Sequence, residues 1–410
     1  MGECDHLISI ARSMTDVSKD VYFVPQGSEE AMDRKKILIF GAGNLCFQLL
    51  QMLALRNNFH LFVASRKLEK TTRLCNLVQL STLQLEVMSS ITAVEANLND
   101  IYKVADVLAR IRPDVIVNCA SLHSRQTIDE LPKSCSDELG LAQLGPWLPM
   151  HLAPAYDLMR AVRLAGSRAI TVNAAFPDAV NAVLDKAGLA PVIGVGTVAN
   201  LVPAVRMAIA KLASTTVDQV QVKLVGKHCF SHYLAQTTLP RQSVCKLSYR
   251  ISGMECTGRF SDSDVFRCAR EDFRHTGGVF GQSLTAASAV TVINSILAFD
   301  EVEAHAPGPN GLPGSYPVRI GMGKVLLSLP HGVSRNDAIG INQNCQIQDG
   351  IHSINPDASV HFERAPMSIM ETLLGFSMLH MKLHDVHQWS DELGRKYTAF
   401  ADHARRTVRS

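Results

Sequence analysis

Short, continuously apolar runs alternate with amphipathic segments through the first half of the chain. The runs predicted to be strands are residues 37–40, 61–64, 91–98, 115–117, 169–172 and 192–195. The segments predicted to be helices are residues 45–55, 67–80, 101–111, 152–165, 178–187 and 201–212. Apolar runs this short, without polar alternation, are typical of strands buried on both faces of a parallel sheet. Alternating strands and helices therefore predict an α/β domain.

A glycine turn follows the first predicted strand. Gly41 opens it, and Gly43 has no Cβ to hold the backbone away from a pyrophosphate. The backbone amides of the helix that starts at Asn44 and Leu45 would then face that anion. Cys46 stands where the dinucleotide-binding fingerprint usually has Gly or Ala, and because Cys is small we expect a slightly displaced helix. The sequence therefore predicts a Rossmann dinucleotide-binding domain.

The end of the second predicted strand bears on the choice of cofactor. An NAD-preferring site usually has an acidic residue about 20 positions after the glycines, whereas this chain has Ser65, Arg66 and Lys67. Arg66 can grip a 2′-phosphate bidentately and stack on adenine. We therefore predict NADP as the cofactor, with a cofactor-free Rossmann domain and a solvated Arg66 as the alternative.

The end of the fourth predicted strand should face the nicotinamide, because ligands of open α/β sheets lie beyond the carboxyl ends of the strands. Cys119, Ala120 and Ser121 occupy this position, and their small side chains permit close approach. For Cys119 a packing role is favoured over a nucleophilic one, since no base stands beside it in the sequence. The sequence thus predicts that all three residues contact the cofactor.

Residues 123–150 are long for a connection and contain several Pro and Gly residues. Loops of this length commonly cover a functional site. We therefore predict that His123, Arg125 and Trp147 lie over the substrate.

The composition excludes several classes of protein. The chain has 410 residues, 47% of them hydrophobic and 19% charged, which is enough to bury the cores of two or three domains. A net charge of +2 without a basic stripe argues against nucleic acid as a partner. Ten cysteines without a C-x-x-C pair fit the reduced cytoplasm. The apolar segment 284–299 is interrupted by polar residues and looks too short to span a bilayer, so no membrane association is expected.

From residue 217 the pattern changes to strands with mixed alternation, at residues 217–225, 245–251, 258–260, 318–320 and 324–329. An apolar helix is predicted at 285–299. This pattern favours a smaller α+β domain with a mixed sheet that closes over the nicotinamide. Residues 368–405 should form helices, with a break near Leu393 and Gly394, that pack back on the Rossmann domain. The predicted divisions are an extension at 1–34, the Rossmann domain at 35–200, a substrate and dimerisation domain at 201–350, and C-terminal helices at 351–410.

Several motifs together resemble a known family. They are GAGNLC after the first strand, ASR at the second, DVIVNCAS at the fourth, and NAAFPDAVNAVL followed by PVIGVG. Over roughly residues 35–330 the chain resembles the saccharopine dehydrogenase-like NAD(P)-binding oxidoreductases. The resemblance implies a Rossmann domain, an inserted mixed-sheet substrate domain, and redox chemistry at a carbon bonded to nitrogen, often through an imine. Pro177 and Asp178 replace a Pro-Gly pair of many members, which, with the insertion at 123–150, puts the substrate in doubt.

The proton carrier that hydride transfer requires is sought among residues that titrate near neutrality. The segment GKHCFSHY, residues 226–233, concentrates such groups, and His228 is the first candidate for catalysis, with Tyr233 beside it. Asp178, at a predicted helix start, is a further candidate, although helix capping explains it equally well.

Four residues are candidates for contacting the substrate: His123, Asn181, Tyr316 and Arg319. The last two lie in the Gly- and Pro-rich stretch 305–319, which is predicted to be an irregular loop, and Arg319 could clamp a carboxylate.

The sequence predicts no metal site and leaves a second class of function open. His380, His384 and His387 are better explained as a solvated helix face than as ligands. A short-chain dehydrogenase is disfavoured, because Arg160 would have to replace the lysine that such enzymes place four residues after their tyrosine. The expected function is a cytoplasmic NADP-dependent oxidoreductase acting on a small amino-acid-like metabolite. Homodimerisation through the sheet of the second domain is expected from fold analogy alone. The alternative is a non-catalytic, NADP-binding redox sensor.

Overall fold

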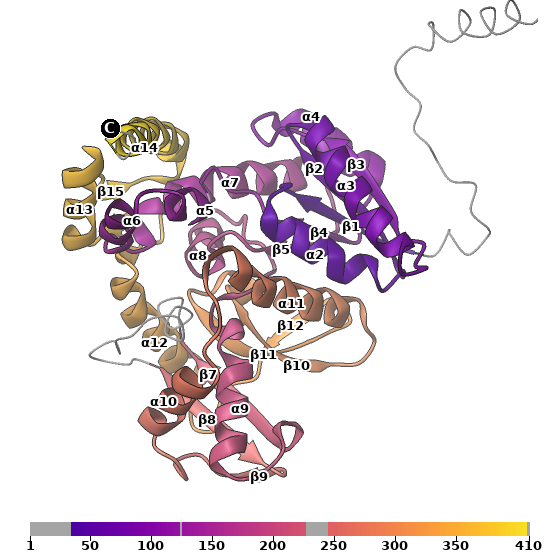
Figure 1. Ribbon diagram of the computed structural model, residues 1–410, viewed down its shortest axis with the longest axis vertical. Helices are drawn as coiled ribbons and strands as arrows, with labels where there is room; N and C mark the ends of the chain where they lie inside the picture. The colour runs from indigo at the N-terminus through magenta and orange to yellow at the C-terminus, as the bar shows by residue number, and fades with distance from the viewer. Residues whose placement is uncertain (1–33, 124, 227–244, 408–410) are drawn as a thin grey trace, which may run out of the picture. The chain divides into compact units, whose positions relative to one another are not determined.

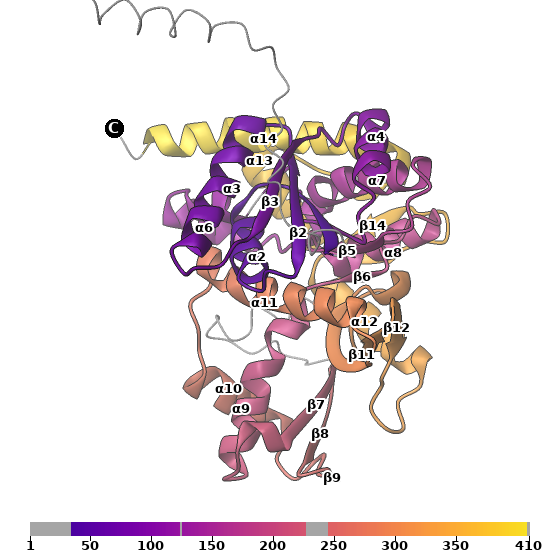
Figure 2. The same ribbon diagram turned by 90° about the vertical axis from the view of Figure 1, so that its right-hand side faces the viewer.

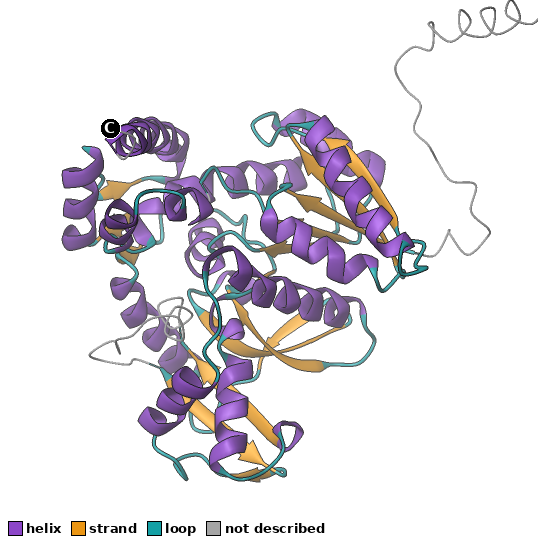
Figure 3. Ribbon diagram, viewed as in Figure 1, coloured by secondary structure: helices purple, strands orange, loops and turns teal. Residues whose placement is uncertain are grey.

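The computed structural model describes residues 34–123, 125–226 and 245–407. The chain divides into two units, Met1–Arg34 and Lys35–Ser410, and the description below concerns the second. Figure 1 shows its elements along the chain, and Figure 3 distinguishes its helices from its strands. His228 and Tyr233, the predicted proton carriers, lie outside the described residues, as do His232 and most of the extension.

A six-stranded parallel sheet forms the first region, with the strand order β3-β2-β1-β4-β5-β6. Its strands are β1 Lys35–Phe40, β2 Phe59–Ser65, β3 Ser90–Glu95, β4 Val115–Asn118, β5 Ile170–Asn173 and β6 Ile193–Gly194. All neighbouring strands pair in parallel. This is the order of a doubly wound dinucleotide-binding sheet, with its topological switch between β1 and β4. The predicted Rossmann architecture is confirmed.

Helices cover both faces of this sheet because alternate strand residues point to opposite sides. Ile37 and Ile39 of β1 join one hydrophobic cluster, and Leu38 and Phe40 join another. The first cluster includes α2 Asn44–Ala54 and α3 Leu68–Leu83, and the second includes α4 Ile101–Ile111, α7 Leu148–Leu164 and α8 Pro177–Lys186. Each fully buried aliphatic side chain of this kind contributes roughly 1.5–3 kcal/mol.

Most boundaries in this region match the predictions, and the misses have local causes. Helix α4 spans the predicted residues, and the side chain of Asp100 accepts a hydrogen bond from the Lys103 amide at 3.2 Å as its N-cap. Strand β3 ends at Glu95, because residues 96–100 turn toward α4. Asp178 does not cap α8, since Phe176 is the N-cap, Pro177 fills the first turn and no side chain caps the helix.

The prediction of a long loop at residues 123–150 is wrong, because this segment is largely helical. It contains α5 Arg125–Asp129, α6 Lys133–Gly140 and the 3-10 helix η2 Gly145–Trp147. Its apolar side chains enter the hydrophobic cluster that also holds α7 and the C-terminal helices: Ile128, Leu131, Leu139, Ala142 and Trp147. The Pro and Gly residues therefore separate short packed helices.

The second region contains two small antiparallel sheets rather than one mixed sheet. One has the order β7-β8-β9, from β7 Val220–Val225, β8 Lys246–Ile251 and β9 Met254–Glu255. The other has the order β10-β11-β12, from β10 Val302–Pro307, β11 Ser315–Gly321 and β12 Lys324–Leu327. An isolated bridge between Gly226 and Ser315 joins the two. The predicted strand at 258–260 is a turn, and the predicted loop at 305–319 is largely the β10–β11 hairpin around the 3-10 helix η6 Pro309–Gly311.

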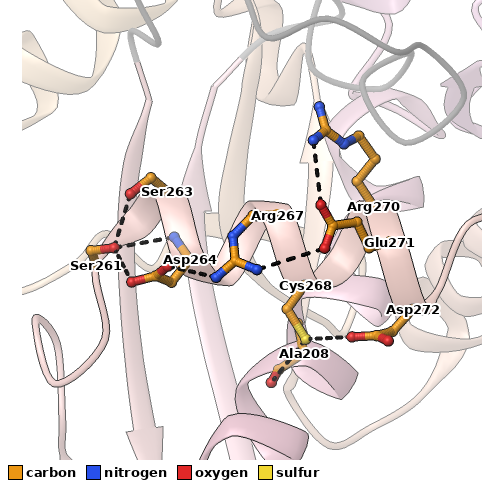
Figure 4. Close-up of polar contacts among 9 residues, drawn as sticks. All are labelled: Ala208, Ser261, Ser263, Asp264, Arg267, Cys268, Arg270, Glu271 and Asp272. Carbon is orange, nitrogen blue, oxygen red and sulfur yellow. Dashed lines mark hydrogen bonds and ion pairs between the residues drawn. The ribbon is translucent and has the colours of Figure 1, made fainter.

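Helices α9 Val202–Leu212 and α10 Asp262–Asp272 pack on the first of these sheets. Figure 4 shows the polar residues along α10, where Ser261 caps the helix and Arg267 contacts Asp264 at 2.8 Å. The Cys268 thiol donates a hydrogen bond to Asp272 at 3.2 Å, and burial raises its pKa. These contacts order one helix surface, and nothing in them requires a ligand.

Helix α11 Gly278–Leu297 lies between the two regions, against α2 (Figures 1 and 2). It begins well before the predicted residue 285, and it is long and apolar enough to cross a membrane by length and composition. The core helix of a soluble protein can have the same length and composition, and 39% of the most apolar stretch of α11 is buried. Its residues Ala289 and Ile293 share a hydrophobic cluster with Ile37 and Ile39 of β1, so α11 is part of the core on that face of the sheet.

The C-terminal part packs back on the helices of the Rossmann domain, as predicted. After α12 Arg335–Gln348, the strands β13 Ile351–Ile354, β14 Val360–Phe362 and β15 His380–Met381 form a third antiparallel sheet, which the sequence did not reveal. Helices α13 Arg364–Leu374 and α14 Val386–Thr407 follow, and Figure 2 shows α14 above α7. The helical break lies at residues 375–385, whereas α14 runs through Leu393 and Gly394.

His387 is one of the polar residues that dock α14. Its Nε2 lies 3.1 Å from Oδ1 of the buried Asp157 on α7, and this hydrogen bond raises the pKa of the imidazole. His384 lies 3.3 Å from Asp385. Within residues 34–123, 125–226 and 245–407, no cluster of three or more His, Cys, Asp or Glu side chains could hold a metal ion.

Candidate functional site: the carboxyl edge of the parallel sheet

The glycine turn has the geometry that a dinucleotide needs. Gly41 has a φ of +101°, and a Cβ there would lie 2.9 Å from backbone atoms of Cys119 and Ala120. Gly43 has a φ of −92°, and a Cβ there would meet nothing within 4 Å. Gly41 is thus required by the close approach of two chain segments, and Gly43 borders open space. The two glycines have different physical roles.

Helix α2 begins at this turn without a side-chain cap. The first amides of a helix have no intrahelical acceptor, and with the helix dipole they favour an anion. The residues present therefore fit the pyrophosphate of a dinucleotide, which Gly43 leaves room for. The side chain of Asn44 donates to the Val279 carbonyl at 3.0 Å and to Gln282 Oε1 at 2.8 Å on α11, so only its backbone amide is placed for a phosphate. Leu45 is half-buried against the core.

The adenine end of the predicted site lies at the end of β2. Ser65 Oγ is 2.6 Å from Thr71 Oγ1 and accepts a hydrogen bond from the Lys67 amide at 3.2 Å, which orders the turn into α3. Arg66 and Lys67 are exposed, and no described carboxylate forms an ion pair with either. Glu95, the exposed last residue of β3, pairs in register with Ser65. The adenine end therefore presents two cations and, one strand away, one carboxylate.

The end of β4 carries the three residues predicted to face the nicotinamide. The Cys119 amide donates to the Phe40 carbonyl at 2.8 Å, and the Ala120 amide donates to Asn118 Oδ1 at 3.1 Å. Burial raises the pKa of the Cys119 thiol to about 12, so the thiol stays protonated at neutral pH, which agrees with a packing role. Ser121 is exposed beyond the strand.

His151, in the first turn of α7, is a functional candidate that the sequence did not reveal. Its Nδ1 lies 3.0 Å from Ser121 Oγ, and its ring lies 6.0 Å from that of Phe176, which follows β5. An imidazole can accept or donate a proton, and this one lies beside the end of a central strand. No sequence spacing marks it, because Ser121 and His151 are joined only by the fold.

The other predicted residues near β5 and β6 are buried in a polar network. Asn118 Nδ2 donates to Asn173 Oδ1 at 3.0 Å, Asn173 Nδ2 donates to Asn181 Oδ1 at 2.9 Å, and Asn181 Nδ2 donates to the Gly308 carbonyl at 3.1 Å. Asp178 Oδ1 accepts from Ser315 Oγ at 3.0 Å. Asp178 and Asn181 are both 0% exposed. These contacts join α8 to the β10–β11 hairpin, so both side chains lie in the interior between the two regions rather than on an open surface.

Backbone strain accompanies this network. Phe176 has a φ of +46° and Thr197 a φ of +55°, and neither is a glycine. Thr197 Oγ1 lies 2.6 Å from Ser315 Oγ. Strained non-glycine residues cost on the order of 1–3 kcal/mol and persist where the surroundings hold them. The network around Ser315 supplies such surroundings, and no sequence motif marks Ser315 or Thr197.

The remaining substrate candidates are not gathered at this edge. His123 is buried, stacks on Trp147 with ring centroids 4.3 Å apart, and meets Tyr397 of α14 edge-on. The Tyr316 hydroxyl donates to the Pro313 carbonyl at 2.6 Å, and burial raises its pKa. Arg319 lies 3.5 Å from Glu301 on the surface. His123 and Tyr316 are thus core residues, and Arg319 is a surface ion pair.

Comparison with known proteins supports the fold. No family model and no curated protein matches the sequence. Among solved structures, the chain is similar to malate dehydrogenase from Plasmodium falciparum, with 12% identity and a TM-score of 0.54 over 77% of this chain and 96% of that one. It is also similar to malate dehydrogenase from Cryptosporidium parvum, with 14% identity and a TM-score of 0.52 over 76% and 99%. A third is lactate dehydrogenase from Eimeria maxima with NADH and oxamate, with 13% identity and a TM-score of 0.51 over 77% and 92%. At such identities the similarity shows a shared dehydrogenase-type fold, and none of these proteins is a saccharopine dehydrogenase.

Proposed function

We propose that the protein is an NADP-dependent oxidoreductase that transfers a hydride between NADPH and an imine or ketone carbon of a small amino-acid-like metabolite. The observation that carries the proposal is the uncapped start of α2 at Gly43, where a Cβ would meet only open space. Gly41 and Gly43 would admit the pyrophosphate, the amides of Asn44 and Leu45 would bind it, and Cys119 to Ser121 would lie along the nicotinamide. The nicotinamide supplies the hydride, while the protein orients the substrate and exchanges one proton.

The preference for NADP rests on the end of β2. Arg66 is exposed beside the adenine end, no described carboxylate neutralises it, and a guanidinium can hold a 2′-phosphate bidentately. The imine or amine chemistry rests on the sequence resemblance to the saccharopine dehydrogenase-like enzymes, which the motifs quoted above carry.

A second candidate is an NAD-dependent oxidoreductase of 2-hydroxy and 2-oxo acids. Two observations favour it: Glu95 pairs in register with Ser65 and could accept a hydrogen bond from a ribose hydroxyl, and similar structures are named lactate and malate dehydrogenases. The non-catalytic alternative is a redox sensor that binds NADPH without consuming it.

Replacing Arg66 by Asp tests the cofactor assignment. Losing a charge-assisted contact worth about 1.5–3 kcal/mol should raise the Kd for NADPH by roughly 10- to 100-fold, with less than about a threefold change for NADH. Calorimetric titration of both nucleotides measures this difference. Lys70→Asp is the matched control, because it reverses an exposed charge on the first turn of α3 and should leave both constants nearly unchanged.

Equal losses for NADPH and NADH in Arg66→Asp would contradict the NADP assignment, and the absence of binding by wild-type protein would remove the proposed function. Substrate class is then decided by NADPH consumption with a panel of 2-oxo acids, with and without amines. Consumption only when an amine is present supports imine reduction, and binding without any consumption favours the sensor.

A further inference from the structure

A cleft lined by described residues lies away from the carboxyl edge of the parallel sheet. It has a volume of about 820 Å³ and lies between the two small antiparallel sheets, with α9 on one side and α11 on the other. The residues that line it lie between positions 199 and 331 of the sequence. None of them belongs to the glycine turn or to the ends of β2 and β4. A cavity of this size holds a small organic molecule.

The cleft has both apolar and polar lining, and its apolar side chains gather on two helices. One face of α11 contributes Leu284, Ala287 and Thr291, which recur at helical spacing on the side opposite the buried Ala286 and Ile293. Val202 and Pro203 at the start of α9 form the opposing wall. Ala287 is exposed, so this face of α11 has no covering element in the described chain.

Polar groups gather in one part of the lining. Lys223 Nζ lies 2.8 Å from Ser328 Oγ and 3.4 Å from Glu303, and Ser328 Oγ donates to Glu303 at 2.8 Å. Arg206 donates from Nε to the Val220 carbonyl at 2.9 Å and from a terminal nitrogen to the Val217 carbonyl at 3.0 Å. Among the described residues no carboxylate forms an ion pair with Arg206, so the group carries more positive than negative charge.

His305 adds a hydrogen-bond donor to this group. The Leu224 amide donates to its Nε2 at 3.0 Å, which assigns the ring proton to Nδ1. Burial lowers the pKa of the imidazole to about 4, with Glu303 opposing the shift and Lys223 and Arg206 adding to it. His305 is therefore neutral near pH 7, and in the described part of the chain no hydrogen bond from Nδ1 is made. A neutral donor beside two cations suits an anionic oxygen.

We propose that this cleft binds a small organic anion with an apolar body, whose carboxylate lies at Lys223, Arg206 and His305 and whose body lies between α9 and α11. The site is separate from the dinucleotide site and does not depend on the function proposed above. Its occupant would be an effector rather than the hydride acceptor, because no residue at the ends of β1 and β4 lines the cleft.

The test uses the full chain and two probes with the same apolar body and opposite charge, 4-phenylbutyrate and 4-phenylbutylamine, followed by calorimetry. Phenylbutyrate should bind at least about tenfold more tightly than the amine, since one charge-assisted contact is worth roughly that much. Lys223→Met should weaken phenylbutyrate by about tenfold without weakening the amine.

Ala287→Trp should abolish binding of phenylbutyrate by filling the cleft, while the midpoint of chemical denaturation stays that of the wild-type protein. Ser283→Trp is the matched control, because it places the same indole at an exposed position of α11 that does not line the cleft. Failure of phenylbutyrate to bind at about 10 mM, or equal binding of the two probes, would overturn the proposal. So would a sedimentation result in which wild-type protein is a dimer and Ala287→Trp is a monomer, because the cleft would then be an interface between two copies.

Discussion

The two halves of the carboxyl edge of the parallel sheet differ in how they treat polar groups. In the open half, at the ends of β2, β1 and β4, Gly43, Arg66 and Ser121 are exposed, and α2 starts without a cap. In the sealed half, at the ends of β5 and β6, Asn173, Asp178 and Asn181 are buried and bonded to each other or to the second region. The same edge thus offers a ligand site on one side and an internal interface on the other.

This difference teaches that position beyond a strand end does not by itself identify a binding residue. A polar group buried at such a position needs partners within the protein, and Ser315 Oγ donates such a hydrogen bond to Asp178 Oδ1. Polar groups of the open half instead leave donors and cations toward solvent, which is the state a charged cofactor requires. Exposure and hydrogen-bond partners therefore separate two sets of residues that share one edge.

The largest predicted effect separates two glycines of the same turn. Gly41→Ala should destabilise the protein by about 3 kcal/mol, because φ is +101° and the new Cβ would lie 2.9 Å from the β4 turn. Chemical denaturation measures the change. Gly43→Ala should change stability by less than about 1 kcal/mol, since its φ is compatible with alanine and nothing lies within 4 Å.

Titration with NADPH tests whether Gly43 has the role in binding that its stability effect alone does not show. Gly43→Ala should weaken NADPH by roughly tenfold while the fold is preserved, because the new methyl group occupies space meant for the pyrophosphate. If Gly43→Ala bound NADPH as tightly as the wild-type protein, the open half would not be the phosphate site, and the comparison between the halves would fail.

A moderate effect is expected in the sealed half. Ser315→Ala removes the hydroxyl between Asp178 and Thr197 and should cost about 1–3 kcal/mol of stability, because buried polar partners lose a hydrogen bond. Denaturation should show this loss while the Kd for NADPH stays unchanged. Ser283→Ala, at an exposed site of α11, is the control and should change stability by no more than about 0.5 kcal/mol. A variant with unchanged stability and weakened NADPH binding would place Ser315 in the ligand site instead.

The open half could be predicted from the sequence because its determinants are local. The strand before Gly41, the spacing of the two glycines, and Arg66 at the end of the next strand all lie within about one βαβ unit of chain. Backbone geometry follows from these neighbours, so the turn, α2 and the exposed cations have the positions that the pattern indicated.

The sealed half could not be predicted because its partners come from distant segments. Asp178 meets Ser315, which is 137 residues away, and Asn181 meets Gly308, which is 127 residues away. The prediction that Asp178 is a helix cap or an acid rested only on the sequence of its own helix. The prediction that Tyr316 and Arg319 lie in an irregular loop was wrong, because both lie in β11. The prediction that residues 123–150 cover the substrate failed for the same reason. His123 and Trp147 contact Tyr397, which lies about 250 residues further along the chain.

The smallest effect concerns a carboxylate within the open half. Glu95 faces Ser65 across the β2–β3 pair, and its charge opposes the attraction that Arg66 and Lys67 would exert on a 2′-phosphate. Because exposed charges interact by only a few tenths of a kcal/mol to about 1 kcal/mol, Glu95→Gln should tighten NADPH by roughly two- to fivefold. The gain should shrink as salt is raised, which titration at low and high ionic strength would detect. Weaker NADH binding with unchanged NADPH binding would instead identify Glu95 as a ribose ligand and favour the NAD-dependent alternative.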